Sequence, residues 1–183
     1  MGISEDTIGS TAAYAARNVA DLAAAQGALR GRPTDPSGRT RPTAGAPIDL
    51  GILDHMIAAR DELVEHTRAH TDVTAPVPRE HAAVYAWYEQ HTPHLDDAAR
   101  RAGEAIVYRQ ALEAAVLARN AGALSPERCP SCRCFSLQWV PDLNAAVCRN
   151  TVYDSDKRGR PRRWTLAQIA ENAVQNRTVR AAT

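Results

Sequence analysis

The chain has 183 residues with 22 Lys or Arg, 21 Asp or Glu and a formal net charge of +1, a length that suits one domain or a helical body with a small appended module. No apolar run approaches the roughly 18 residues that a membrane-spanning helix needs, and the acidic start Met1–Asp6 lacks the basic and then apolar pattern of a secretory signal. We therefore expect no membrane partner and a cytoplasmic location.

Segment 1–30 is expected to form an amphipathic helix. Apolar residues recur at spacings of three and four, namely Ile8, Ala12, Ala15, Val19, Leu22 and Leu29. The segment is rich in alanine, so the helix must pack closely on a partner helix or remain marginal. Segment 31–47 follows with four prolines and three glycines, which predicts a flexible linker.

Segment 48–124 is predicted to form a helical body. A helix over about 49–70 begins at Asp49, a suitable N-cap, and its apolar face consists of Ile52, Leu53, Met56, Ile57, Leu63 and Val64. The paired histidines of this segment could bind a metal, but no carboxylate motif accompanies them, so we expect them to face solvent. These pairs are His66 with His70 and His91 with His94.

Two more helices are expected in the same body. A short one covers about 79–90 and offers Val84, Trp87 and Tyr88 as its apolar residues. A longer one is predicted from 93 to about 120, with Thr92 as its N-cap and Gly122 placed to end it. No strand pattern occurs before residue 125.

Segment 125–183 has a different pattern. Phe135, Leu137 and Trp139 alternate with polar residues, as in a half-buried strand. A turn follows, and 145–148 can return as the second strand. A last helix opens with a capping box, Thr165 with Gln168, and a hydrophobic staple, Trp164 with Ile169. The expected fold is mainly α: a helical bundle or hairpin, then a small β-hairpin module and a C-terminal helix.

All four cysteines of the chain lie in this last segment, at Cys129, Cys132, Cys134 and Cys148. A C-x2-C-x-C set with a fourth cysteine nearby indicates a metal site rather than disulfides in a protein without a secretory signal. The two-residue spacing lets Cys129 and Cys132 face one ion, and the returning strand brings Cys148 to the same end of the hairpin. Four reduced cysteines packed as small apolar residues are the alternative.

The runs CPSCRCFSL, AAVCRN and RRWTLAQIA resemble a zinc ribbon, and more closely the small, mostly uncharacterised zinc-ribbon proteins of actinobacteria and their phages. The scarcity of lysine, with Lys157 alone, also suits the high-GC genomes of such organisms. The chain departs from the zinc-ribbon pattern at two positions. Arg133 stands where these knuckles usually have glycine, and Tyr153 stands where a partner for Cys148 is expected.

The fourth ligand must therefore come from elsewhere. Cys134 would complete a tetrahedral site of four thiolates, whereas Asp154 or Asp156 suits zinc among thiolates less well. Zinc is the expected metal, and an iron–sulfur cluster is the alternative because it also takes four cysteines. A site closed by four protein ligands leaves no position for water or substrate, so we expect a structural metal and no enzyme.

Positive charge is concentrated in the same part of the chain. Residues 129–183 hold nine Arg or Lys against four acids, a pattern typical of nucleic-acid readers. DNA or RNA contacts are expected from Arg149, Lys157, Arg158, Arg160, Arg162 and Arg163, with Trp139, Tyr153 or Trp164 able to stack on bases. The alternative is an interaction or structural adaptor, such as a phage component, in which the metal is a folding staple and the helices bind a second copy or another protein.

Overall fold

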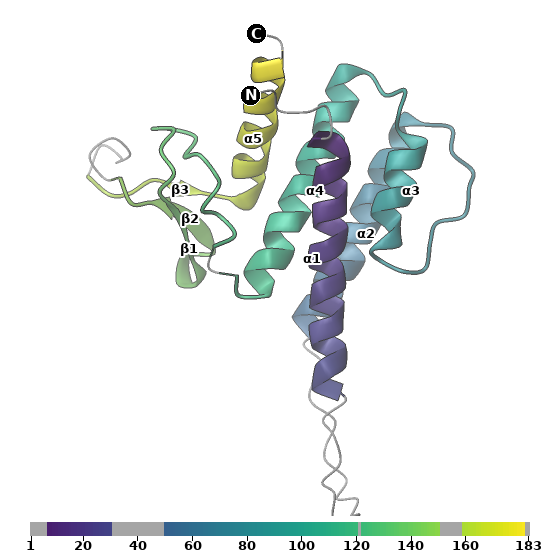
Figure 1. Cartoon of the computed structure of the whole chain (residues 1–183), viewed down its shortest axis with the longest axis horizontal. Helices are drawn as coiled ribbons and strands as arrows, with labels where there is room; N and C mark the ends of the chain where they lie inside the picture. Colours follow the sequence, from purple (N-terminus) through teal and green to yellow (C-terminus); the bar gives the residue numbers. More distant parts are fainter. Residues whose placement is uncertain (1–6, 31–49, 121, 151–158, 182–183) are drawn as a thin grey trace, which may run out of the picture.

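The computed structural model of the chain describes residues 7–30, 50–120, 122–150 and 159–181 (Figure 1). Its helices are α1 (Thr7–Arg30), α2 (Leu50–His70), α3 (Ala83–His91), α4 (Asp97–Leu117) and α5 (Leu166–Ala181). Between α4 and α5 lie the strands β1 (Leu137–Val140), β2 (Ala145–Cys148) and β3 (Arg163–Trp164), and the short 3-10 helix η1 (Pro141–Leu143) joins the first two. The expected mainly α fold is confirmed, whereas the linker 31–47 and the cap at Asp49 lie outside the described residues.

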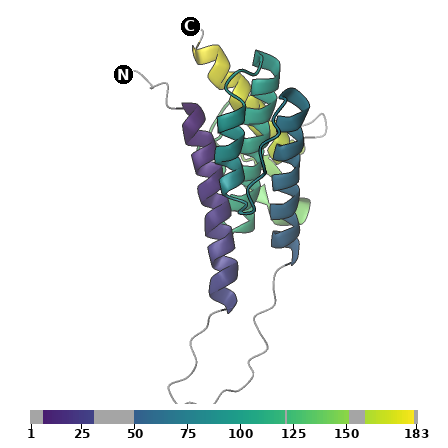
Figure 2. The same cartoon turned by 90° about the vertical axis from the view of Figure 1, so that its right-hand side faces the viewer.

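Helix α4 lies at the centre of the molecule and contacts α1, α2 and α5. Figure 1 shows α5 and the sheet on one side of α4, with α2 and α3 on the other. In Figure 2, α4 lies between α1 and α2. One helix therefore supports both the helical body and the segment that contains the cysteines.

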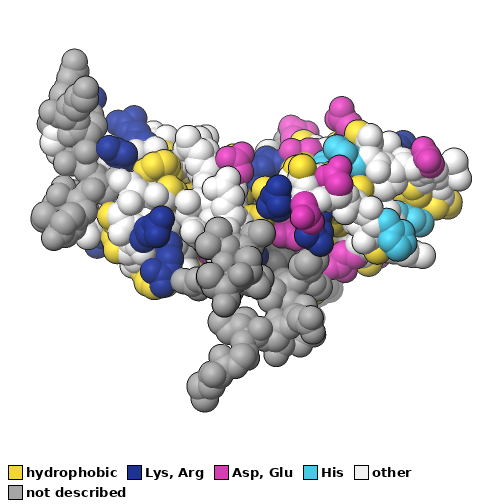
Figure 3. Space-filling view, turned by 90° about the horizontal axis from the view of Figure 1, so that it is seen from above, with side chains coloured by type: hydrophobic (Ala, Val, Ile, Leu, Met, Phe, Trp, Pro, Cys, Tyr) yellow, Lys and Arg dark blue, Asp and Glu magenta, His cyan; other side chains and the backbone are white. Residues whose placement is uncertain are grey.

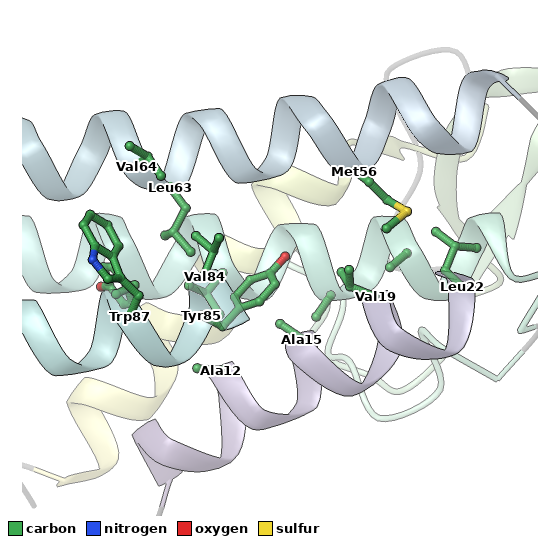
Figure 4. Packing of buried hydrophobic residues seen from close by; sticks show 14 residues of the cluster. Ala12, Ala15, Val19, Leu22, Met56, Leu63, Val64, Val84, Tyr85 and Trp87 are labelled. Carbon is green, nitrogen blue, oxygen red and sulfur yellow. The ribbon is translucent and has the colours of Figure 1, made fainter. Parts of the chain in front are cut away.

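The first core lies among α1, α2, α3 and α4 (Figure 4). Its α1 residues are Ala12, Ala15, Val19 and Leu22, at the spacing expected from the sequence. The small alanines let α1 approach α4 closely, and Asn18 Nδ2 on α1 donates a hydrogen bond to the Ala111 carbonyl oxygen on α4 (3.1 Å). The expectation that this alanine-rich helix packs on a partner helix is confirmed.

The start of α4 differs from the sequence prediction. Asp96, not Thr92, is the N-cap, and its carboxylate accepts hydrogen bonds from the backbone N–H groups of Ala98 (2.9 Å) and Ala99 (2.8 Å). A carboxylate at this position also interacts favourably with the helix dipole, and these hydrogen bonds hold the pKa of Asp96 below its usual range. Thr92 instead caps the end of α3, where its hydroxyl donates to the Tyr88 carbonyl oxygen (2.7 Å).

Helix α4 ends at Leu117, before the glycine expected to terminate it. Arg119 has a left-handed backbone (φ 58°). Its N–H donates to Val116 O and the N–H of Asn120 donates to Ala115 O, both at 2.9 Å. This pair of bonds is a Schellman motif, so Arg119 takes the terminating position that the sequence analysis gave to Gly122. Helix α3 also begins later than expected, at Ala83, because i to i−3 turns occupy 80–84.

His66 is buried, contrary to the expectation that it faces solvent. Its ring on α2 lies 6.3 Å from the Tyr88 ring on α3, measured between centroids. Gly103 on α4 leaves room for both rings, because a Cβ there would overlap Tyr88 Oη and lie 2.8 Å from His66 Nε2. Burial lowers the pKa of His66, and the neighbouring His70 lowers it further.

The sheet is antiparallel with the order β1-β2-β3. The first two strands form the expected hairpin, in which Leu137 pairs with Cys148. Strand β3 was not expected, because Arg163 and Trp164 end a polar, arginine-rich stretch. Trp164 nevertheless pairs with Ala146 on β2 and lies half-buried against the cysteine segment.

Phe135 does not belong to β1 and is exposed, although the alternating pattern placed it on the buried face of the strand. The N–H of Cys129 donates to the Cys134 carbonyl oxygen (2.9 Å) and so closes a turn just before Phe135. The chain therefore enters the sheet only at Leu137, which is buried as expected.

Helix α5 opens with the expected capping box. The N–H of Thr165 donates to Gln168 Oε1 (3.0 Å), and the N–H of Gln168 donates to Thr165 Oγ1 (3.2 Å). Ile169 is fully buried and Trp164 is packed against the same cluster, which agrees with the expected staple. Helix α5 packs on α4 along its length.

A second core joins α4, the cysteine segment, the sheet and α5. Its buried members are Tyr108, Leu112, Leu124, Cys129, Leu137, Ala146, Cys148, Leu166, Ile169 and Ala170. Just before the first cysteine, the buried Glu127 accepts a hydrogen bond from Tyr108 Oη on α4, and the Arg177 guanidinium of α5 lies 4.4 Å from the Tyr108 ring centroid. The cysteine segment therefore packs against α4 and α5, and the division into segments 1–30, 48–124 and 125–183 stays a prediction.

Candidate metal centre and basic face

The first three cysteines lie on a tight turn that follows Glu127. Cys129 N–H donates to Cys134 O, and Arg133 N–H donates to Cys129 O, both at 2.9 Å. Arg133 adopts a left-handed backbone (φ 59°), which explains in physical terms why similar knuckles favour glycine there. A residue with a Cβ adopts this conformation at a cost of about 1–2 kcal/mol, and the hydrogen bonds of the turn offset it.

Three thiols converge on one point. The Sγ atoms of Cys129, Cys132 and Cys148 all lie within 4.8 Å of one another, and Cys132 Sγ is 3.6 Å from Cys148 Sγ. A tetrahedral ion with metal–sulfur bonds of about 2.3 Å separates its ligand sulfurs by about 3.8 Å. These three residues could therefore hold a metal ion with little movement.

Cys134 lies beside this group of three. Its Sγ is 2.8 Å from Cys132 Sγ and 3.8 Å from Cys148 Sγ. The second distance already suits a shared ion, whereas the first is shorter than a tetrahedral edge and would lengthen on metal binding. Cys134 is therefore the nearest candidate for a fourth ligand in the part of the chain that the structure describes; Asp154, Asp156 and Tyr153 lie outside it.

The polar groups around Cys134 favour its thiolate. The neighbouring Cys132 thiol, the Ser136 hydroxyl and Asn150 Nδ2 all lie within hydrogen-bonding distance of Cys134 Sγ. Hydrogen bonds from Cys132 and then Ser136 lower the pKa of Cys134 to about 7, while burial raises the pKa of Cys132. Either thiol of this close pair can donate to the other, and metal binding would require both to lose their protons.

The four cysteines are free thiols that could hold a metal ion. All four are free, and Cys129 and Cys148 are fully buried in the second core. Ser136 and Asn150 provide the outer hydrogen bonds that orient metal-bound thiolates in proteins. The spacing argument from the sequence is thus supported at the level of a possible metal site.

A second polar cluster lies between α2 and α4, and two of its members, Glu62 and Arg109, line a surface pocket. Arg109 donates to both Glu62 and Glu113, and the bond to Glu113 is 3.0 Å long. Gln110 donates through Nε2 to Glu62 (2.9 Å) and accepts through Oε1 from Tyr85 Oη (3.0 Å). The arginine bridges the two carboxylates and neutralises part of their charge, which is a structural arrangement.

The arginines expected to bind nucleic acid are exposed where the structure describes them. Arg149 follows β2, Arg163 lies on β3, and Arg160 and Arg162 precede β3. Lys157 and Arg158 lie outside the described residues. Arg163 pairs with Val147, which pairs with Gln138, and Gln138 Oε1 accepts a hydrogen bond from Arg149 Nε. Arg149 and Arg163 therefore flank the outward face of the sheet.

Sequence reasoning gave no binding role to three residues at the cysteine turn: Arg128, Arg133 and Phe135. The Arg128 guanidinium lies 4.3 Å from the Phe135 ring centroid, and its Nη1 donates to the Arg133 carbonyl oxygen (3.1 Å). Phe135 is 58% exposed. Its place directly after a C-x2-C-x-C turn was a usable signal, because the turn delays the start of the strand.

We call the arginines Arg128, Arg133, Arg149, Arg160, Arg162 and Arg163 the basic face. Among the described residues, no ion pair joins Arg128, Arg133, Arg149 or Arg163 to a carboxylate. In Figure 3, blue basic side chains gather over the part that carries the sheet, and magenta acidic side chains gather over the helical part. The charge asymmetry seen in the sequence is thus also a spatial one.

Comparison with known proteins adds no relative: no protein-family model matches the chain, and no curated protein or solved structure is significantly similar to it. Among the described residues, every helix is too short or too polar to cross a bilayer. The site must therefore be interpreted from its own chemistry.

Proposed function

We propose that this chain is a non-enzymatic zinc protein whose metal module binds nucleic acid through the basic face. The observation that carries the proposal is the convergence of Cys129, Cys132 and Cys148 at the end of a hairpin whose outward face carries exposed arginines. The module follows the order of a zinc ribbon, a cysteine turn, a hairpin and a returning cysteine, which supports the resemblance to the small zinc-ribbon proteins of actinobacteria and phages. A reducing cytoplasm would keep the four thiols available.

Zinc is favoured over an iron–sulfur cluster by the spacing of the sulfurs. The separations of 3.6 Å and 3.8 Å from Cys148 to Cys132 and Cys134 are those of ligands sharing one ion. A cluster places its own iron and sulfide atoms between the thiolates and needs them further apart. Four protein thiolates also close the coordination sphere, which suits a structural metal.

We expect protein purified without added metal to contain one zinc per chain by elemental analysis. Cys134→Ser should lower the affinity for zinc, measured by competition with a chelator, because it removes the fourth thiolate. Ser131→Ala is the matched control, since Ser131 is exposed on the same turn. Folded protein with neither zinc nor iron would contradict the proposal. Iron together with visible absorption would indicate an iron–sulfur cluster in place of zinc.

Nucleic-acid binding is supported by exposed arginines that gather on and beside the sheet. The strands fix Arg149 and Arg163 on one face of the sheet, and the metal site would fix the turn that carries Arg133. Arginines that neutralise phosphates release counterions, so affinity should fall steeply with salt. Such contacts give binding without strong sequence preference.

The triple substitution Arg149→Ala, Arg162→Ala and Arg163→Ala tests this proposal. We expect it to weaken binding by a similar factor on unrelated sequences, and to flatten the dependence of log K on log salt by about one unit per lost phosphate contact. A fluorescence-anisotropy salt series measures both effects.

The matched control for this triple variant removes three exposed arginines from α1 and the helical body: Arg17→Ala, Arg68→Ala and Arg79→Ala. It causes the same change in net charge and should leave binding nearly unchanged. An equal loss of affinity in the control would indicate that the phosphate contacts lie on the helices. No binding of the wild type at low salt would remove the nucleic-acid proposal.

A protein adaptor is the second candidate, and helix α2 favours it. Leu53 and Ile57 lie one turn apart and are 39% and 42% exposed, so they present an apolar patch. An adaptor would bind a second copy or another protein through the helices, and its metal would serve only to hold the hairpin. It predicts no nucleic-acid binding at low salt.

A further inference from the structure

Phe135 is the one phenylalanine of the chain and the most exposed of its large apolar side chains among the described residues. It lies on a bend between the cysteine turn and β1, where backbone pairing does not require an aromatic residue. The ring packs against the Arg128 guanidinium, yet it stays 58% exposed inside the basic face. Its position requires an explanation that the charge of the basic face does not supply.

We propose that Phe135, held by Arg128, is a stacking platform for an unpaired base, so that the ligand of the basic face is single-stranded nucleic acid. This inference rests on the function proposed above and specifies its substrate class. An aromatic ring stacks on any base through its π face, and nearby arginines hold the phosphates; this combination is the usual basis of single-strand binding.

The ring is held in place before any ligand arrives. The Arg128 guanidinium lies 4.3 Å from the ring centroid and is itself held by the bond from Nη1 to Arg133 O (3.1 Å). The Phe135 backbone follows directly on Cys134, whose carbonyl oxygen closes the turn with Cys129 N–H. A base that stacks on such a prearranged ring loses less affinity to the ordering of the protein.

The other aromatic residues of the module are less available. Trp139 and Trp164 are half-buried and pack against the second core, so their rings already have partners. Tyr153 lies outside the described residues. The bases of a duplex offer no free π face to a ring at its surface, whereas a single strand can turn its bases toward Phe135.

The test compares an unstructured thymidine oligonucleotide with a duplex of equal length, using the full-length zinc-loaded protein and fluorescence anisotropy at one low salt concentration. We expect Phe135→Ala to weaken single-strand binding by about fivefold to a hundredfold and to leave duplex binding and the salt slope unchanged. Phe135→Trp should retain single-strand binding, because it keeps a stacking ring. Unchanged zinc content and circular dichroism establish that each variant is folded.

Four results would overturn the inference. An unchanged affinity of Phe135→Ala for the single strand would mean that no base stacks on this ring. An equal loss of affinity for the single strand and the duplex would mean that Phe135 supports the binding surface in general and does not stack on a base. Wild-type binding to the duplex alone would leave the proposed function standing without this ligand class, whereas binding to neither probe would remove both proposals and favour a protein partner for Phe135.

Discussion

Cys148→Ser is expected to release the metal and to unfold the hairpin, while most of the first core stays folded. Cys148 is fully buried in the second core, with its Sγ 3.6 Å from Cys132 Sγ. Structural zinc contributes on the order of 10 kcal/mol of apparent free energy at neutral pH, which is as large as the whole stability of an ordinary domain. A serine hydroxyl is a poor substitute for a thiolate, so the hairpin should lose most of this stabilisation.

Two signals should report this change separately. The fluorescence of Trp139 and Trp164, which pack against the second core, should shift to longer wavelength as they become exposed. Trp87 lies in the first core, most of which should stay folded. The helical circular dichroism should therefore fall by little more than the contribution of α5. Ser131→Ala should behave as the wild type. Wild-type zinc content and melting temperature in Cys148→Ser would show that Cys148 is not a ligand.

The convergence of the cysteines into a candidate metal site could be predicted from the sequence because its geometry is local. One turn fixes the distance between Cys129 and Cys132, and the hairpin fixes the position of Cys148 relative to them. Pairing about the turn at 141–144 puts Leu137 opposite Cys148, and this pairing follows from the alternating pattern and the turn residues. The start of α5 was predictable for the same reason, since its capping box involves residues three positions apart.

Other features depend on contacts between distant segments and could not be predicted in this way. Strand β3 exists because Trp164 pairs with Ala146, which is supplied by another strand. Asp96 and Thr92 are both suitable N-caps for α4. Asp96 takes this position because the Thr92 hydroxyl already bonds to the end of α3. Local propensity does not decide between such alternatives.

The burial of His66 has the same origin and leads to the second large prediction. A glycine inside a predicted helix is only a weak signal in a sequence, yet Gly103 makes room where α2, α3 and α4 meet. Gly103 has no left-handed backbone angle, so the lack of space, and not the conformation of the chain, excludes a side chain. Helix propensity alone would favour alanine there by about 1 kcal/mol.

Gly103→Ala is expected to destabilise the protein by about 1–3 kcal/mol, despite its better helix propensity. The new Cβ would overlap Tyr88 Oη and lie 2.8 Å from His66 Nε2, so two buried rings would have to move. Denaturant unfolding followed by circular dichroism measures the loss. Because this contact lies in the helical body, the zinc content should stay at the wild-type value.

The double variant Gly103→Ala with Tyr88→Phe tests the cause. Removing the Tyr88 hydroxyl deletes the atom nearest to the new methyl group, so the double variant should be more stable than the sum of the two single effects predicts. A coupling of about 0.5–3 kcal/mol is typical of residues in direct contact. Strict additivity of the two free-energy changes would place the strain at His66 instead. An increase in stability from Gly103→Ala alone would show that the helices can separate at no cost.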